Sequence, residues 1–394
     1  MNLLIAIFAA QKDSYMFGIY VHVPFCRSRC IYCGFYSTTS LALRDRYVRA
    51  LCDELTEYSG KFDGNVATIY FGGGTPSQLS LDHLSSVMTN IRDNYSIDDS
   101  AEVTIECNPD DINEDYLSGL RSLGYNRLSM GVQSFNDSRL SFLRRRHSSK
   151  QAIKAVELAK QAGFDNISID LMFGFPGQTL DQWKDDIHTV LSLGVQHLSA
   201  YSLMYEDGTR LTEMLDKGAV SEIDEELSAL MYECLIDETE AAGLEHYELS
   251  NWATPGHRSR HNSSYWHNIP YLGAGAAAHS FDGKKRWSNP ASLTEYLEGM
   301  ENKRLRREYE QLSTNEMYDE YVMTGLRTKD GIDLNELTEK FGSVMTDYVM
   351  NNAETHIKGG RIELINGTNG HNIMRLTRRG LFVSNDIMSD LMYI

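Results

Sequence analysis

Residues 18–33 read GIYVHVPFCRSRCIYC, an apolar run followed directly by three cysteines. The run at 18–25 has the apolar, β-branched and aromatic composition of a buried strand. Cys26, Cys30 and Cys33 then follow with the spacing C-x3-C-x2-C. A structural zinc ion normally takes four protein ligands, whereas a cubane iron–sulfur cluster held by three thiolates keeps one iron open. The stretch therefore predicts a strand that ends at an iron–sulfur site, with buried or zinc-binding thiols as the alternative.

Composition limits the class of protein. The chain has 394 residues, 42% of them hydrophobic, and a formal net charge of −18. This length is sufficient for two or three packed domains. The acidic balance argues against a nucleic-acid partner, because phosphate binding needs concentrated Lys and Arg. No apolar run approaches the roughly 20 residues of a transmembrane helix.

The ends of the chain and its other cysteines indicate the compartment. The apolar residues 3–10 are few and lack a basic flank, so we expect no signal peptide. We expect residues 1–16 to be a disordered or non-native extension, with Met16 as an alternative start. Cys52, Cys107 and Cys234 are scattered, as packing residues are, and form no secreted disulfide pattern. This use of cysteine fits a protein of the reducing cytoplasm.

Strand-like and helical segments alternate from residue 18 to about 205. A parallel sheet with helices outside is the economical fold for six such units. Because six strands are fewer than the eight of a closed barrel, we expect an α/β fold with an open, partial (β/α)6 barrel. The predicted strands are 18–25, 67–71, 102–106, 127–132, 167–172 and 197–202, and the predicted helices are 43–59, 81–94, 114–123, 137–145, 149–162 and 181–193.

Glycines, carboxylates and amides gather where each predicted strand ends. In parallel barrels the active site lies at the carboxyl ends of the strands. After the cysteine loop come the glycine run 72–74, Glu106, Gln133, Asp170 and residues 201–202. Taken singly, a tight turn or a solvated carboxylate explains each of these. Together they predict one site at one end of the barrel.

The C-x3-C-x2-C spacing is the signature of the radical S-adenosylmethionine (SAM) superfamily. The surrounding sequence resembles its coproporphyrinogen dehydrogenase-like family over residues 17–394. The resemblance implies a [4Fe-4S] cluster on Cys26, Cys30 and Cys33, with the amine and carboxylate of SAM on the open iron. It also implies SAM-binding roles for a further set of residues, the last three of them at a second SAM or an equivalent pocket: Tyr20, Tyr32, Gly73, Gly74, Thr75, Glu106, Gln133, Arg145 and Asp170.

Two features distinguish branches of this family. The coproporphyrinogen III dehydrogenases carry a fourth cysteine two positions after the third, where this chain has Phe35. Residues 261–266 read HNSSYW, which resembles the H-N-x-x-Y-W marker of the heme chaperone branch. The resemblance therefore implies a carrier that binds heme and transfers it to acceptor hemoproteins. Radical SAM oxidative decarboxylation of coproporphyrinogen III is the alternative, and catalytic activity is left undecided.

The segment around this marker has the residue types that heme requires. An axial imidazole, an aromatic or apolar wall and cations for two propionates are needed. Five of the twelve histidines fall within residues 246–279, beside arginines and tryptophans. We expect His261 to contact heme, with His257 and His267 as fallback ligands, although a structural role is common for single histidines.

The chain changes character near residue 300. Helices at 312–324, 334–341 and 381–391 and a hairpin at 361–364 and 374–377 resemble the small winged-helix-like module of the family, used as a lid or docking surface. The expected domains are thus a barrel at 17–205, an α+β extension with the heme motif at 206–299 and this module at 300–394. We expect a cytoplasmic protein, and leave open a peripheral position at the inner face of the membrane, where some acceptors lie.

Overall fold

The computed structural model describes residues 16–367 and 370–393. The extension expected at residues 1–16 lies outside the described residues except for Met16, which begins the first strand. Within the described residues the chain forms a twelve-stranded sheet and a separate three-stranded sheet. The order of the large sheet is β12-β11-β10-β9-β1-β2-β3-β4-β5-β6-β8-β7.

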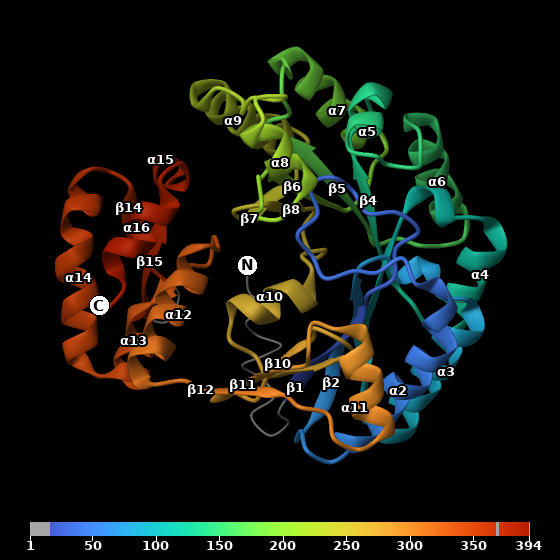
Figure 1. Ribbon diagram of the computed structural model, residues 1–394. Helices are drawn as coiled ribbons and strands as arrows, with labels where there is room; N and C mark the ends of the chain where they lie inside the picture. The colour runs from blue at the N-terminus through green and yellow to red at the C-terminus, as the bar shows by residue number, and fades with distance from the viewer. Residues whose placement is uncertain (1–15, 368–369, 394) are drawn as a thin grey trace.

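The six predicted strands form the centre of the large sheet as adjacent parallel neighbours. Helices cover its outer side, and the sheet curves without closing (Figure 1). The predicted partial (β/α)6 barrel is confirmed. Its strands are β1 (Met16–Val23), β2 (Asn65–Gly73), β3 (Ile97–Cys107), β4 (Arg127–Gln133), β5 (Ile167–Phe173) and β6 (His197–Ser202). Its helices are α2 (Arg44–Glu57), α3 (Leu81–Asn94), α4 (Glu114–Ser122), α5 (Asp137–Phe142), α6 (Ser149–Gln161) and α7 (Leu180–Ser192), with short 3-10 turns at Leu41–Leu43, Pro76–Gln78 and Pro109–Asp111.

Local sequence explains where the outer helices begin. Ser80, Ser148 and Thr179 each cap a helix, and the side chain three residues later bonds back to the cap in every case. This capping box satisfies backbone N–H groups that have no partner inside the helix. The three helices α3, α6 and α7 therefore start at positions that the sequence encodes.

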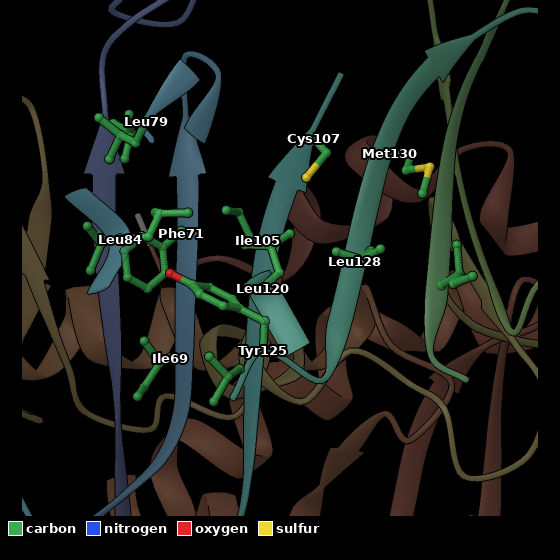
Figure 2. Close-up of a cluster of buried hydrophobic side chains, with 14 of the residues drawn as sticks. Ile69, Phe71, Leu79, Leu84, Ile105, Cys107, Leu120, Tyr125, Leu128 and Met130 are labelled. Atoms are coloured by element: carbon green, nitrogen blue, oxygen red, sulfur yellow. The ribbon is translucent and has the colours of Figure 1, made fainter. Parts of the chain in front are cut away.

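Alternation along the strands separates an apolar outer face from a polar inner face. On β2, Ile69 and Phe71 point outward and pack beneath Leu84 of α3 and Leu120 of α4 (Figure 2). Because successive strand residues point to opposite faces, the residues between them point into the barrel. The inward set on the six strands is rich in hydroxyls, carboxylates and rings, including Tyr20, Tyr70, Glu106, Ser129, Asp170 and Ser199.

Residues of the expected extension complete both edges of the barrel sheet. β7 (Glu245–Glu248) and β8 (Asn251–Ala253) lie beyond β6, and β9 (Tyr271–Ala274) pairs in parallel with β1. Barrel and extension share one buried core, and β12 joins the same sheet, so residues 17–311 form one structural unit. The remaining elements here are α8 (Arg210–Asp216), α9 (Glu225–Ala241), α10 (Arg260–Trp266), β10 (His279–Phe281), β11 (Lys285–Ser288), α11 (Leu293–Glu301) and β12 (Glu308–Gln311).

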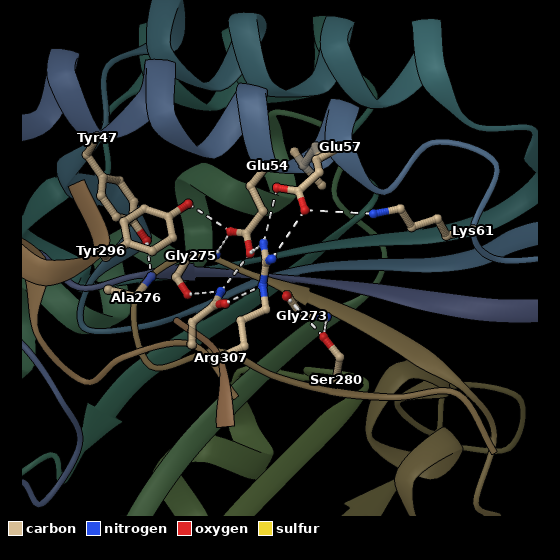
Figure 3. A network of polar contacts seen from close by, with 12 residues as sticks. Tyr47, Glu54, Glu57, Lys61, Gly273, Gly275, Ala276, Ser280, Tyr296 and Arg307 are labelled. Atoms are coloured by element: carbon tan, nitrogen blue, oxygen red, sulfur yellow. Dashed lines mark hydrogen bonds and ion pairs between the residues drawn. The ribbon is translucent and has the colours of Figure 1, made fainter. Parts of the chain in front are cut away.

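After β9 the chain returns along the first strands of the barrel, and residues 275–307 are called the returning segment here. A buried polar network attaches this returning segment to α2. Glu54 is 0% exposed and accepts hydrogen bonds from the Gly275 backbone N–H and the Tyr296 hydroxyl, each at 2.8 Å (Figure 3). Arg307 pairs with it at 3.2 Å. Since buried charges are tolerated only when paired and hydrogen-bonded, this network fixes the segment against the barrel.

The C-terminal module has its own buried core, whose residues come from the sequence range 318–391. The predicted hairpin is confirmed by the antiparallel pairing of β14 with β15, and the helix predicted at 334–341 by α13. Since β12 belongs to the large sheet, the module begins after residue 311 and not at 300. Its elements are α12 (Thr314–Leu326), β13 (Ile332–Asp333), α13 (Leu334–Phe341), α14 (Ser343–Lys358), β14 (Ile362–Asn366), β15 (Asn372–Leu376), α15 (Arg378–Leu381) and α16 (Ser384–Leu391).

Two details of the module differ from the sequence prediction. The closing helix predicted at 381–391 is interrupted after Leu381 and resumes at Ser384. The long helix α14 was not predicted, although its buried residues Val349, Ala353 and His356 have the i, i+4, i+7 spacing of a helix face.

Candidate functional site

The three predicted cluster cysteines lie on one loop at the carboxyl end of β1. The loop is closed at its base, where the Cys26 N–H donates to the Thr38 carbonyl at 2.9 Å and the Thr38 N–H donates to Pro24 at 2.6 Å. Cys26 is buried, and Cys30 and Cys33 are half-buried. Burial raises the pKa of the Cys26 and Cys33 thiols. The loop thus holds its thiols at the rim of the barrel.

Glycine is required where the second strand end passes this loop. A Cβ on Gly74 would lie 2.9 Å from the Pro24 carbonyl carbon and 3.1 Å from the Cys26 sulfur. Gly73 has a φ of +111°, and a Cβ there would meet the His22 ring at 2.6 Å. A side chain at Gly74 would have to displace the Pro24 backbone, and one at Gly73 would meet the His22 ring in a strained conformation. The glycine run therefore allows the end of β2 to approach the cysteine loop closely.

The donor set fits a cluster with three protein ligands. Cys52 and Cys234 lie on α2 and α9, Cys107 is buried at the end of β3, and Phe35 is 70% exposed at the position of the fourth family cysteine. In the part of the chain that the structure describes, no three Cys, His, Asp or Glu side chains converge as ligands of a single metal ion. Each thiolate of a cubane cluster binds a different iron, so convergence on one point is not needed.

Glu106 lies beside the glycine run on the inner face of the barrel. Its carboxylate accepts hydrogen bonds from the Tyr70 hydroxyl at 2.8 Å and from the Gly73 N–H at 3.2 Å. Burial raises the pKa of Glu106 to about 7, and the nearby Asp170 charge adds to this effect. A carboxylate in this position can pair with an ammonium group or with ribose hydroxyls.

Asp170 and Gln133 lie on the next strands. The Ser129 hydroxyl donates to Asp170 at 3.3 Å, and burial raises the pKa of this carboxyl to about 6. Gln133 has a φ of +72° at an irregularity in the pairing of β4 with β5, which turns the end of β4. Positive φ is unusual for a residue with a side chain. These residues lie on β4 and β5, three and four strands from β1 in the sheet.

Arg145 and Tyr32 lie against the cysteine loop. The Arg145 guanidinium donates to the Cys30 sulfur at 3.5 Å and to the Asn108 side chain at 2.6 Å. Burial raises the pKa of the Tyr32 hydroxyl, and the Arg145 charge opposes that effect. The structure therefore brings Arg145 to the cysteines themselves, and not only to the neighbouring pocket.

His261 lies deep on the concave side of the barrel, on α10. Its Nδ1 is 2.8 Å from the Thr68 hydroxyl and its Nε2 is 2.9 Å from the Tyr265 hydroxyl. Burial lowers the pKa of the ring to about 3, so the imidazole is neutral. Both ring nitrogens have hydrogen-bond partners in this conformation, so ligation of heme iron by His261 would require one of these bonds to break.

The two fallback histidines lie elsewhere. His257 is part of a turn, where its Nδ1 lies 3.1 Å from the Thr254 hydroxyl. The His267 side chain is 50% exposed and its Nε2 lies 4.0 Å from Asp330 of the C-terminal module. The hydrogen-bond and ion-pair partners of these two rings therefore differ from those of His261.

Tyr70 joins the heme-motif helix to the carboxylate at the barrel rim, and the sequence prediction missed it. Its ring stacks on His261 with centroids 5.1 Å apart, while its hydroxyl bonds Glu106. Tyr20 stacks on both rings at 6.2 Å. Strand alternation places Tyr70 on the same face as Gly72, and this signal was sufficient to find it.

Comparison with known proteins identifies the family of this chain. Residues 20–190 match the radical SAM superfamily, and residues 312–383 match the HemN C-terminal domain. The chain is 36% identical to the heme chaperone HemW of Bacillus subtilis over 94% of this chain and 98% of the relative. It is 34% identical to the heme chaperone HemW of Escherichia coli over 66% and 69% of the two chains.

A solved structure supports the fold. Coproporphyrinogen III oxidase (HemN) of Escherichia coli, described as a radical SAM enzyme, superposes with a TM-score of 0.82 over 98% of this chain and 93% of that chain, at 22% sequence identity. The whole architecture, including the C-terminal module, is therefore that of the HemN fold. On this sequence identity and coverage, the chain belongs to the heme chaperone HemW family of the radical SAM superfamily.

Proposed function

We propose that this protein is a heme chaperone, which binds heme beside a SAM-ligated [4Fe-4S] cluster and transfers the heme to acceptor hemoproteins. The observation that carries the cluster assignment is the rim of the barrel, where Cys26, Cys30 and Cys33 share one loop with no fourth thiol. The names of the relatives support heme as the cargo.

The residues of the chain have separable tasks at this rim. Cys26, Cys30 and Cys33 would hold the cluster, which when bound supplies one iron for the amine and carboxylate of SAM and an electron for its sulfonium. Tyr20, Tyr32, Gly73, Gly74 and Thr75 would surround the bound nucleotide. Glu106 and Asp170 offer carboxylates to its cationic or hydroxyl groups, and Gln133 and Arg145 offer donors.

For heme, we keep His261 as the contacting residue, with His257 and His267 as fallback ligands. Ligation by His261 requires that its ring release either Thr68 or Tyr265, since both nitrogens are bonded. The His267 side chain is 50% exposed, so its ring could bind heme iron without first breaking a buried hydrogen bond. A heme titration of His261→Ala and His267→Ala, with His188→Ala as a surface control on α7, distinguishes the ligands. The variant that weakens heme binding or shifts its spectrum, with an unchanged cluster spectrum, identifies the residue.

We place this activity in the cytoplasm, where the six free cysteines remain reduced. Across the described ranges, no helix has the length and apolar character to cross a bilayer. Acceptors at the inner face of the membrane would be reached by peripheral contact. Flotation of the purified protein with liposomes tests that contact directly.

One anaerobic experiment tests the function against its alternative, oxidative decarboxylation of coproporphyrinogen III. The cluster is reconstituted, SAM is added, and heme titration by absorbance is run beside an assay of coproporphyrinogen III conversion. We expect stoichiometric heme binding and no conversion, because Phe35 replaces the fourth cysteine. Conversion without a heme complex would overturn the chaperone proposal.

A further inference from the structure

A continuous chain of hydrogen bonds connects two of the predicted cluster ligands. Arg145 donates from Nη1 to the Cys30 sulfur at 3.5 Å and from Nη2 to Asn108 Oδ1 at 2.6 Å. Asn108 Nδ2 lies 3.5 Å from the Thr75 hydroxyl oxygen, which lies 3.4 Å from the Cys26 sulfur. Asn108 is thus the midpoint between Cys26 and Cys30.

The direction of each bond in this chain is set by chemistry. Arg has only donors, so the carbonyl oxygen of the Asn108 amide must face Arg145 and its NH2 group must face Thr75. Thr75 Oγ1 then accepts from Asn108 and is free to donate its own proton to Cys26. The chain therefore delivers a donor to the sulfur at both ends, which is the arrangement that two metal-bound thiolates require.

Asn108 is itself held firmly. Its backbone N–H donates to the Ser77 hydroxyl at 3.2 Å, and Ser77 in turn donates to Asp111 at 2.7 Å. Arg145 has a second anchor in the Gly131 carbonyl. The two bonds from Nη2 therefore fix the orientation of the Arg145 guanidinium and direct Nη1 to Cys30.

Hydrogen bonds to ligating sulfur atoms act on the cluster. They stabilise the reduced cluster more than the oxidised one, because reduction adds negative charge to the sulfurs, and so they raise the reduction potential. A positive guanidinium in contact with one sulfur acts in the same direction.

We propose that Asn108 is a positioning residue for the iron–sulfur cluster, which sets its reduction potential by holding Arg145 against Cys30 and Thr75 against Cys26. This inference rests on the proposed function, because it requires a cluster on these cysteines. Asn108 acts through its two neighbours, Arg145 and Thr75, to which its own side chain is bonded.

The test compares Asn108→Ala, Arg145→Gln and Thr75→Val with the wild type after anaerobic reconstitution. Asn113→Ser, which keeps a capping oxygen on the next helix, is the matched control. Iron and sulfide are measured first, and the reduction potential is then measured by EPR-monitored titration with dithionite in the absence of SAM. We expect full iron content and a lower potential in all three variants, and the wild-type potential in the control.

A further variant tests whether Asn108 acts through its neighbours. In the Arg145→Gln/Thr75→Val background, adding Asn108→Ala is expected to produce no further shift. A wild-type potential in Asn108→Ala at full iron content, or an undiminished shift in that background, would overturn the inference. If Asn108→Ala takes up no iron, a wild-type potential in Arg145→Gln would overturn it equally. Failure of the wild type to bind iron and sulfide refutes the cluster assignment instead, which is a separate outcome.

Discussion

Replacing Glu54 by Ala should destabilise the protein strongly, because this carboxylate holds the returning segment to α2. It is 0% exposed and accepts from the Gly275 N–H, the Asn289 amide and the Tyr296 hydroxyl, each at 2.8 Å. Its ion pair with Arg307 is also almost entirely buried. Removing one partner of a buried pair costs about 3–5 kcal/mol, since the other charge stays buried without compensation.

Urea unfolding followed by tryptophan fluorescence measures this loss. Three of the four tryptophans, Trp183, Trp252 and Trp287, lie in the main core, so the signal reports on the unit that Glu54 stabilises. Glu57→Ala is the matched control, because Glu57 lies one turn further along α2, pairs with the same Arg307, and has a side chain that is 45% exposed. Exposed pairs contribute about 0.2–1 kcal/mol. A loss in Glu54→Ala no larger than that in Glu57→Ala would refute the reasoning.

Three further predictions concern the barrel rim. Cys33→Ser should abolish the brown chromophore and the sulfide of the reconstituted protein, whereas Cys234→Ser should retain both; full iron in the first variant would remove Cys33 from the ligand set. Gly74→Ala should lower cluster content, because its Cβ would lie 2.9 Å from the Pro24 backbone; equal content in variant and wild type would contradict the close approach. SAM affinity should rise as the pH passes through about 7, because Glu106, whose pKa burial raises to about 7, becomes ionised there. The same raised pKa means that the contribution of Glu106 to stability is greatest below its ordinary value of 4.5 and is lost as the pH rises through 7. Calorimetric titrations of the reconstituted protein from pH 6 to 8 measure the affinity, and Glu106→Gln, which should flatten the profile, is the control; a pH-independent affinity in the wild type would exclude this role.

The sequence predicted the barrel because each of its signals is local. Alternation along β2 and the capping residues Ser80, Ser148 and Thr179 depend only on near neighbours in the chain. The strand β9 could not be placed this way, since its pairing with β1 joins residues about 250 positions apart. Contacts between distant segments determine which strand lies at this edge of the barrel.

In the candidate site, too, local signals could be predicted from the sequence and long-range contacts could not. The resemblance predicts Cys26, Cys30 and Cys33 as cluster ligands, and strand topology explains why their loop lies at the same end of the barrel as Glu106 and Asp170. What the sequence could not show is the state of single side chains. His261 has a typical ligand side chain, but Thr68, from a strand far away in sequence, occupies its Nδ1. The role of Asn108 likewise depends on partners from two other loops.

The stacked rings of Tyr70 and His261 give the molecule a mechanical link between its two expected ligands. If the His261 ring moves when it binds iron, its stacking on Tyr70, whose hydroxyl donates to Glu106, changes as well. Heme binding would then change the affinity for SAM. By thermodynamic linkage, SAM binding would change the affinity for heme by the same factor. A heme carrier with this coupling would release heme when SAM binds or leaves.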